Sequence, residues 1–114
     1  GKQVYDAIVA ADMLAKENIQ AEIIDLRTLY PLDKELIAQS VSKTHRVVVV
    51  TEENRRGGYG GELSAMIAEE LFNELDAPVA RIGALNTPTP YAPNQEAYYL
   101  PNETDIVNAV KQML

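Results

Sequence analysis

Four consecutive valines at positions 47–50 constrain the fold of this chain more than any other feature. Successive side chains of a strand point to opposite faces, so a strand with one face in water alternates apolar and polar residues. This run does not alternate, which means that both of its faces should be covered. The pattern predicts a buried strand at residues 47–51, in a parallel sheet between two layers of helices.

Helices and further strands are predicted to alternate around this strand. Helical spacing predicts helices over residues 3–17, from Asp33 onward, over 63–75 and from about Glu103, while short apolar runs predict strands at 21–26 and 79–84. Asn18 and Asp33 are expected to cap helix ends. Side chains expected to face the core are Leu36, Ile37, Ser40 and Val41, then Leu63, Met66, Ile67, Leu71 and Leu75, and finally Ile106, Val107, Val110 and Met113. This order predicts one α/β domain over residues 1–114, a three-layer α/β/α fold with a largely parallel sheet.

Composition excludes several classes of function. The 114 residues contain no cysteine and a single histidine, which excludes disulfides and a cysteine nucleophile and leaves little for a zinc site. No apolar run approaches the roughly 20 residues that a membrane span needs. The net charge of −7 argues against nucleic-acid binding and would favour a basic protein partner, with a charge that merely keeps the protein soluble as the alternative.

The most distinctive segment joins the valine strand to the next helix. It contains Glu52, Glu53, Arg55, Arg56, Gly57, Gly58 and Tyr59, followed by two more glycines. Ligands often bind at this edge of α/β sheets, and glycines let a partner approach the backbone closely. The spacing matches neither the dinucleotide pattern nor a phosphate-binding loop. We therefore interpret the segment as a candidate interface loop, with a tight turn bearing solvated charges as the alternative.

No catalytic group emerges from the residues themselves. Glu52 and Glu53 are adjacent on a strand and should point to opposite faces, so an ion pair with a neighbouring arginine is a better role than an acid–base pair. His45 lies just before the strand, where a surface position without a catalytic role is expected. These residues predict no catalytic, cofactor-binding or metal-binding set.

Five ordered motifs together resemble one family, the C-terminal, transketolase-like domain of the β subunit of 2-oxo acid dehydrogenase E1 components. They are IDLRTLYPLD at 24–33, VVTEE at 49–53 followed by GGYGGE at 57–62, LDAPVAR at 75–81, TPTPYA at 87–92, and Leu100-Pro101 before the last helix. The family includes pyruvate, branched-chain 2-oxo acid and acetoin dehydrogenase β subunits. Its domain has two strands ahead of the helix that opens this chain, so the resemblance implies a fragment that lacks the first strands of its sheet.

The resemblance also implies a role within a larger enzyme. Parent enzymes are oxidoreductases that decarboxylate a 2-oxo acid on thiamine diphosphate with Mg²⁺ and acylate the lipoyl group of E2. The cofactor contacts lie outside this domain, so the fragment is expected to bind no cofactor and to be inactive alone. Implied partners are the E1 α subunit, a second β subunit and the E2 peripheral-subunit-binding domain, without nucleic acid or membrane. The implied location is the bacterial cytoplasm or the mitochondrial matrix.

Two residues are expected to contact a partner by this resemblance. Asp76 occupies the acidic position of the LDAPVAR motif, which faces E2 in some family members, and Arg81 closes the same motif. The alternative for Asp76 is an ordinary turn residue at a helix end. Two alternative functions stay open: the C-terminal domain of another transketolase-type enzyme, such as deoxyxylulose-phosphate synthase, and a free-standing α/β binding module.

Overall fold

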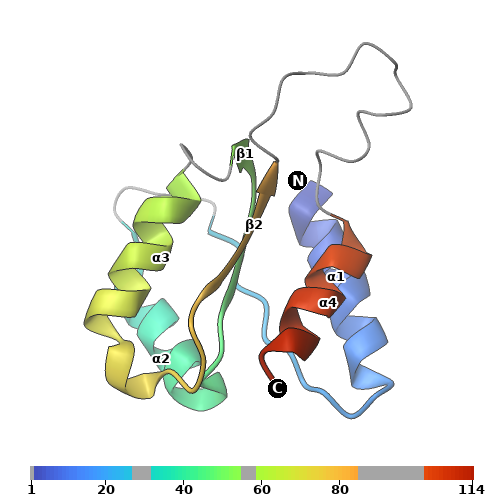
Figure 1. Cartoon of the computed structure of the whole chain (residues 1–114), viewed down its shortest axis with the longest axis horizontal. Coiled ribbons are helices and arrows are strands. Elements are labelled where there is room, and N and C mark those ends of the chain that lie inside the picture. The colour runs from blue at the N-terminus through green and yellow to red at the C-terminus, as the bar shows by residue number, and fades with distance from the viewer. Residues whose placement is uncertain (1, 27–31, 55–58, 85–101) are drawn as a thin grey trace.

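Two pairs of helices enclose a short parallel sheet in the computed structural model, which describes residues 2–26, 32–54, 59–84 and 102–114 (Figure 1). Helices α1 and α4 lie on one side of the strands, and α2 and α3 lie on the other. This arrangement confirms the predicted three-layer α/β fold. The elements are α1 Lys2–Ala15, α2 Lys34–Thr44, β1 Val48–Asn54, α3 Tyr59–Glu70, the short 3-10 helix η1 Phe72–Glu74, β2 Ala80–Ala84 and α4 Glu103–Gln112.

The valine strand β1 sends neighbouring side chains into different helix layers. Val49 is buried and belongs to the core of the α2–α3 layer, with Ile37, Val41 and Ile67. Val50 packs against the core of the opposite layer, which consists of Ala10, Leu14, Ile106 and Val107. Both faces of β1 are therefore covered, as the run of valines predicts.

Strand β1 pairs with β2 in parallel. Val49 lies opposite Arg81, and Val50 lies opposite Ile82. Since paired residues on neighbouring strands point to the same face of a sheet, Arg81 faces the α2–α3 layer together with Val49. This register decides where the Arg81 guanidinium can reach.

The strand predicted at residues 21–26 is not formed. Within the described residues the sheet has only two strands, and this segment is irregular, with Ile23 exposed. Ile19 packs against the α1–α4 core and Leu26 against the α2–α3 core, so the segment crosses from one layer to the other. The prediction used local apolar character, whereas a strand also requires a neighbour that exchanges backbone hydrogen bonds with it.

Helix ends follow the predicted capping chemistry. The Asp33 carboxylate accepts a 3.0 Å hydrogen bond from the Leu36 amide at the start of α2, and Asn18 adopts a left-handed φ of 64° after α1. Asn102 and Asp105 form a reciprocal capping box at the start of α4. Leu36 was expected to face the core, but it is exposed in the first turn of α2, so that prediction was wrong. None of the helices that the structure describes is long and apolar enough to cross a membrane.

Candidate partner-binding site

Asp76 is exposed on the turn that leads from α3 into β2, directly after η1. Its backbone amide donates a 2.8 Å hydrogen bond to the carbonyl oxygen of His45. The Nδ1 atom of the His45 ring lies 2.7 Å from the carbonyl oxygen of Glu74, two residues earlier. His45, which lies between α2 and β1, thus holds the turn before β2 through two hydrogen bonds.

His45 itself occupies an unusual backbone conformation. It ends α2 with φ of 62°, in the left-handed region, while its amide donates to the Val41 carbonyl at 2.8 Å. Left-handed residues commonly end helices in this way, although glycine or asparagine is the usual choice. The residue is half-buried, and its ring contacts the turn before β2, a contact that the expected surface position did not include. The sequence signal that could have revealed this position is the abrupt change from a helical pattern to the valine strand.

The surroundings of Asp76 are acidic. Residues 69–80 contain Glu69, Glu70, Glu74 and Asp76 but no lysine or arginine, and the histidine that contacts this turn is His45. One neighbouring cation comes from α2, because Lys34 forms a 3.3 Å ion pair with Glu70. The rest of this end of α3 offers negative charge to a partner.

Phe72, in η1, is the only phenylalanine of the chain and is 70% exposed. Sequence reasoning did not select it as a candidate site residue. Leu71 continues the inward stripe of α3, and the next residue points about 100° away from it around a helix, which is the signal that could have identified Phe72. Aromatic side chains are enriched at protein-contact surfaces, although single exposed apolar residues also occur without any function.

Arg81 lies at the opposite end of α3 from Asp76. A Cβ atom built on Gly61 would lie 3.3 Å from the Arg81 Nη2 atom, so the guanidinium sits against the first turn of this helix. The twelve residues of α3 span about 18 Å, and Asp76 follows its far end. The structure therefore does not bring the two predicted partner-contact residues together at one point.

The predicted interface loop is described only at its ends. The segment 55–58, with Arg55, Arg56, Gly57 and Gly58, lies outside the described residues. Of Glu52, Glu53 and Tyr59, the structure describes the backbone alone: the glutamates lie in β1, and the tyrosine opens α3. The segment thus joins the end of a strand to the start of a helix, as expected.

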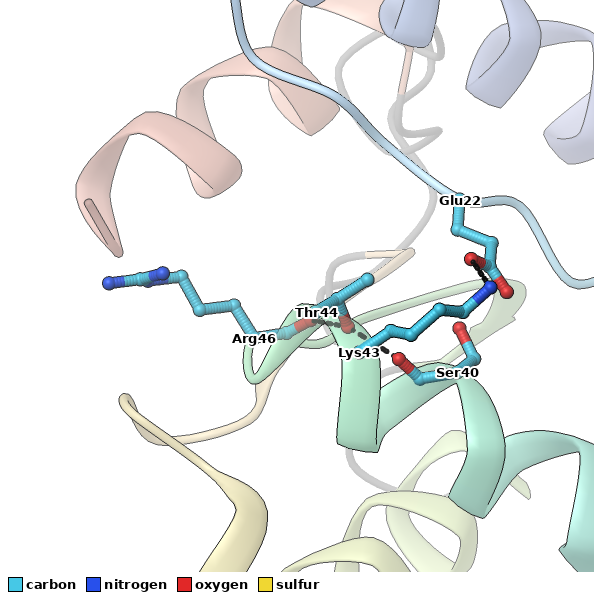
Figure 2. A network of polar contacts seen from close by, with 5 residues as sticks. All are labelled: Glu22, Ser40, Lys43, Thr44 and Arg46. Carbon is cyan, nitrogen blue, oxygen red and sulfur yellow. Dashed lines mark hydrogen bonds and ion pairs between the residues drawn. The ribbon is translucent and has the colours of Figure 1, made fainter.

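A polar network holds the irregular segment 21–26 against α2 (Figure 2). The Lys43 ammonium lies 2.8 Å from the Glu22 carboxylate. This hydrogen bond lowers the pKa of Glu22 below its ordinary value; partial burial opposes the shift, and a hydrogen bond from Ser40 adds to it. At the end of α2, the Thr44 hydroxyl lies 2.9 Å from the Ser40 carbonyl and 3.3 Å from that of Arg46.

Arg46 connects this network to the other helix layer. Its side chain points away from Lys43 in Figure 2, and Nε donates a 3.1 Å hydrogen bond to the Met113 carbonyl after α4. A cation near the last carbonyls of a helix is favourable. These contacts are structural. In the described ranges, no group of three or more histidine, aspartate or glutamate side chains could hold a metal ion.

Comparison with known proteins gives a consistent set of similarities. The family model described as "Transketolase, C-terminal domain" matches residues 1–106. The chain is 45% identical to the pyruvate dehydrogenase E1 component subunit beta of Rickettsia bellii, and this match covers 97% of the chain and 34% of the relative. It is 40% identical to the 2-oxoisovalerate dehydrogenase subunit beta of Bacillus subtilis, over 99% of the chain and 35% of that protein. An acetoin:2,6-dichlorophenolindophenol oxidoreductase subunit beta of the same species is also 40% identical, over 100% of the chain and 33% of its own length. The chain thus spans about a third of the length of these relatives.

Proposed function

The chain belongs to the transketolase C-terminal domain family, and from this premise we propose that it is the assembly and docking domain of an E1 component β subunit. The observation that carries the proposal is 45% identity to a pyruvate dehydrogenase β subunit over 97% of the chain. The five motifs described above occur in the order that the family shows. The pyruvate and 2-oxoisovalerate relatives support this branch over a deoxyxylulose-phosphate synthase.

The parent enzyme, in this proposal, decarboxylates a 2-oxo acid with thiamine diphosphate and Mg²⁺ and transfers the acyl group to the lipoyl group of E2. Among the described residues, no three or more histidine, aspartate or glutamate side chains are grouped so that they could hold a metal ion. We assign cofactor binding to other parts of the enzyme and no catalytic step to this chain. Its location would be the bacterial cytoplasm or the mitochondrial matrix.

The domain would contribute binding surfaces instead of chemistry. Its partners would be the E1 α subunit, a second β subunit and the small, basic E2 peripheral-subunit-binding domain. The acidic turn around Asp76 and the net charge of −7 support the last of these, because complementary charge speeds association and selects partners. The proposal places Asp76 at that contact and leaves Arg81 and the 52–59 loop for subunit contacts.

The test is a calorimetric titration of the chain with the E2 peripheral-subunit-binding domain, carried out at low and at moderate salt. We expect saturable one-to-one binding that weakens as salt is raised, because charged groups meet at the contact. A complete E1 heterotetramer that contains this domain serves as the reference. Failure of both the chain and the heterotetramer to bind would contradict the docking role.

A further inference from the structure

The turn that presents Asp76 has little to hold it in place by itself. Helix η1 has three residues, and its first flanking residue, Leu71, makes no side-chain cap. The hydrogen bonds within the turn are Glu74 N–H to Leu71 O at 2.9 Å and Leu75 N–H to Phe72 O at 3.2 Å. A single turn of this kind is marginal in isolation, because nucleating a helical turn costs more than its few hydrogen bonds return.

We propose that His45 is a positioning residue that fixes this turn for docking, and the inference rests on the proposed function. Its ring reaches the Glu74 carbonyl across 29 positions of sequence, and its own carbonyl accepts the Asp76 amide. Since His45 also closes α2 through Val41, the turn is tied to a three-turn helix. A turn that is ordered before binding does not lose entropy when the partner arrives.

The direction of the ring hydrogen bond follows from its partner. A carbonyl oxygen can only accept, so the His45 Nδ1 atom must carry the proton. Both the neutral Nδ1–H tautomer and the charged imidazolium satisfy this requirement. The geometry therefore assigns the His45 ring the role of donor to the Glu74 carbonyl.

The left-handed backbone of His45 allows a matched pair of substitutions. Glycine and asparagine are the residues that adopt this conformation most readily, so His45→Gly and His45→Asn both preserve the end of α2. The Nδ2 atom of asparagine is bonded to Cγ, as Nδ1 of histidine is, and can donate to the same carbonyl. Glycine has no donor. The two variants therefore differ in whether the side chain can donate a hydrogen bond to the Glu74 carbonyl, while both accept the left-handed backbone conformation.

The first measurement is amide hydrogen exchange, detected by NMR, in the unmodified chain and in the two variants. We expect the Asp76 amide to exchange about tenfold faster or more in His45→Gly and near the unmodified rate in His45→Asn, because local opening sets this rate. The internal reference is the Ala80 amide, which donates to Val47 at 3.1 Å and should not change in either variant. Equal protection of Asp76 in all three chains would overturn this role of the His45 ring.

The second measurement is affinity for the E2 peripheral-subunit-binding domain. Binding should weaken about three- to tenfold in His45→Gly and recover in His45→Asn, as loss of preorganisation predicts. Faster exchange with unchanged affinity would overturn the positioning role in docking. If the unmodified chain and the heterotetramer do not bind, the proposed docking function fails, while the exchange result still decides whether His45 holds the turn.

Discussion

Gly60 shows at the scale of one residue how α3 comes close to β1. A Cβ atom at this position would lie 3.1 Å from Thr51 Cγ2 and 3.7 Å from Val49 Cγ1. We expect Gly60→Val to lower the free energy of unfolding by about 2 kcal/mol, because the added methyl groups would push the helix from the strand. Urea unfolding measures this loss. The control is Ala65→Val on the exposed side of α3, and an equal loss there would show that helix propensity, not packing, decides the outcome.

Removal of one charge tests Asp76. The side chain is exposed, so Asp76→Asn should weaken binding to the E2 domain by less than about 1 kcal/mol, mainly through slower association. The effect should shrink at higher salt, since screening reduces exposed electrostatics. Stopped-flow kinetics at two salt concentrations provide the measurement. The matched control is Asp12→Asn, which removes an exposed carboxylate from α1 and should leave binding unchanged. If the Asp76 variant binds as tightly as the unmodified chain at both salt concentrations, Asp76 is not part of the contact.

Phe72 gives a prediction with a well-matched control. Because its ring is 70% exposed, Phe72→Ala should change the free energy of unfolding by no more than about 0.5 kcal/mol. Affinity for the E2 domain should fall about tenfold, as aromatic anchors near a charged contact often dominate binding. Tyr5→Ala removes a ring that is 68% exposed on α1, in the other helix layer. An equal effect of both variants on binding would indicate a general loss of apolar surface.

At the scale of the element, the contact between residues 21–26 and α2 makes stability depend on pH. Lys43 lowers the pKa of Glu22, so the folded chain holds the ionised form more strongly than the unfolded chain. The pair therefore stabilises the fold above the ordinary carboxyl pKa, and this contribution is lost as pH falls through the lowered value. We expect Glu22→Gln to be less stable than the unmodified chain at neutral pH and to approach it in acid. Urea midpoints between neutral and acidic pH measure the difference, and a gap that stays constant with pH would contradict the assignment.

The sequence predicts correctly those helices and strands that are determined by residues close to one another along the chain. The valine run places β1, because covering both faces is a property of the run itself, and Asp33 marks the start of α2 because a cap acts within one turn. Residues 21–26 show the limit, since apolar character does not reveal whether a partner strand is present. The role of His45 was equally hidden, because its ring meets a carbonyl 29 positions away. The candidate site shows the same limit. Asp76 could be selected from a sequence motif, whereas its contacts with His45 are visible only in the folded structure.

The whole molecule yields one prediction about chemistry. We expect the chain alone neither to decarboxylate a 2-oxo acid nor to bind thiamine diphosphate, because the proposed function assigns the cofactor contacts to other parts of the enzyme. Calorimetry with thiamine diphosphate and Mg²⁺ is the measurement. A complete E1 heterotetramer containing this domain is the positive control. Tight, saturable binding by the chain alone would contradict the assignment of the cofactor to other domains.

One helix layer joins the two extremes of the sequence. Its core consists of Ala10 and Leu14 from α1 and Ile106 and Val107 from α4. During synthesis α1 emerges before α4, and residues 16–102 must be made between them before the two helices can pack together. Until then its apolar face is open to chaperones and proteases. A product truncated before residue 106 would thus lack Ile106 and Val107 and leave the apolar face of α1 without its partner.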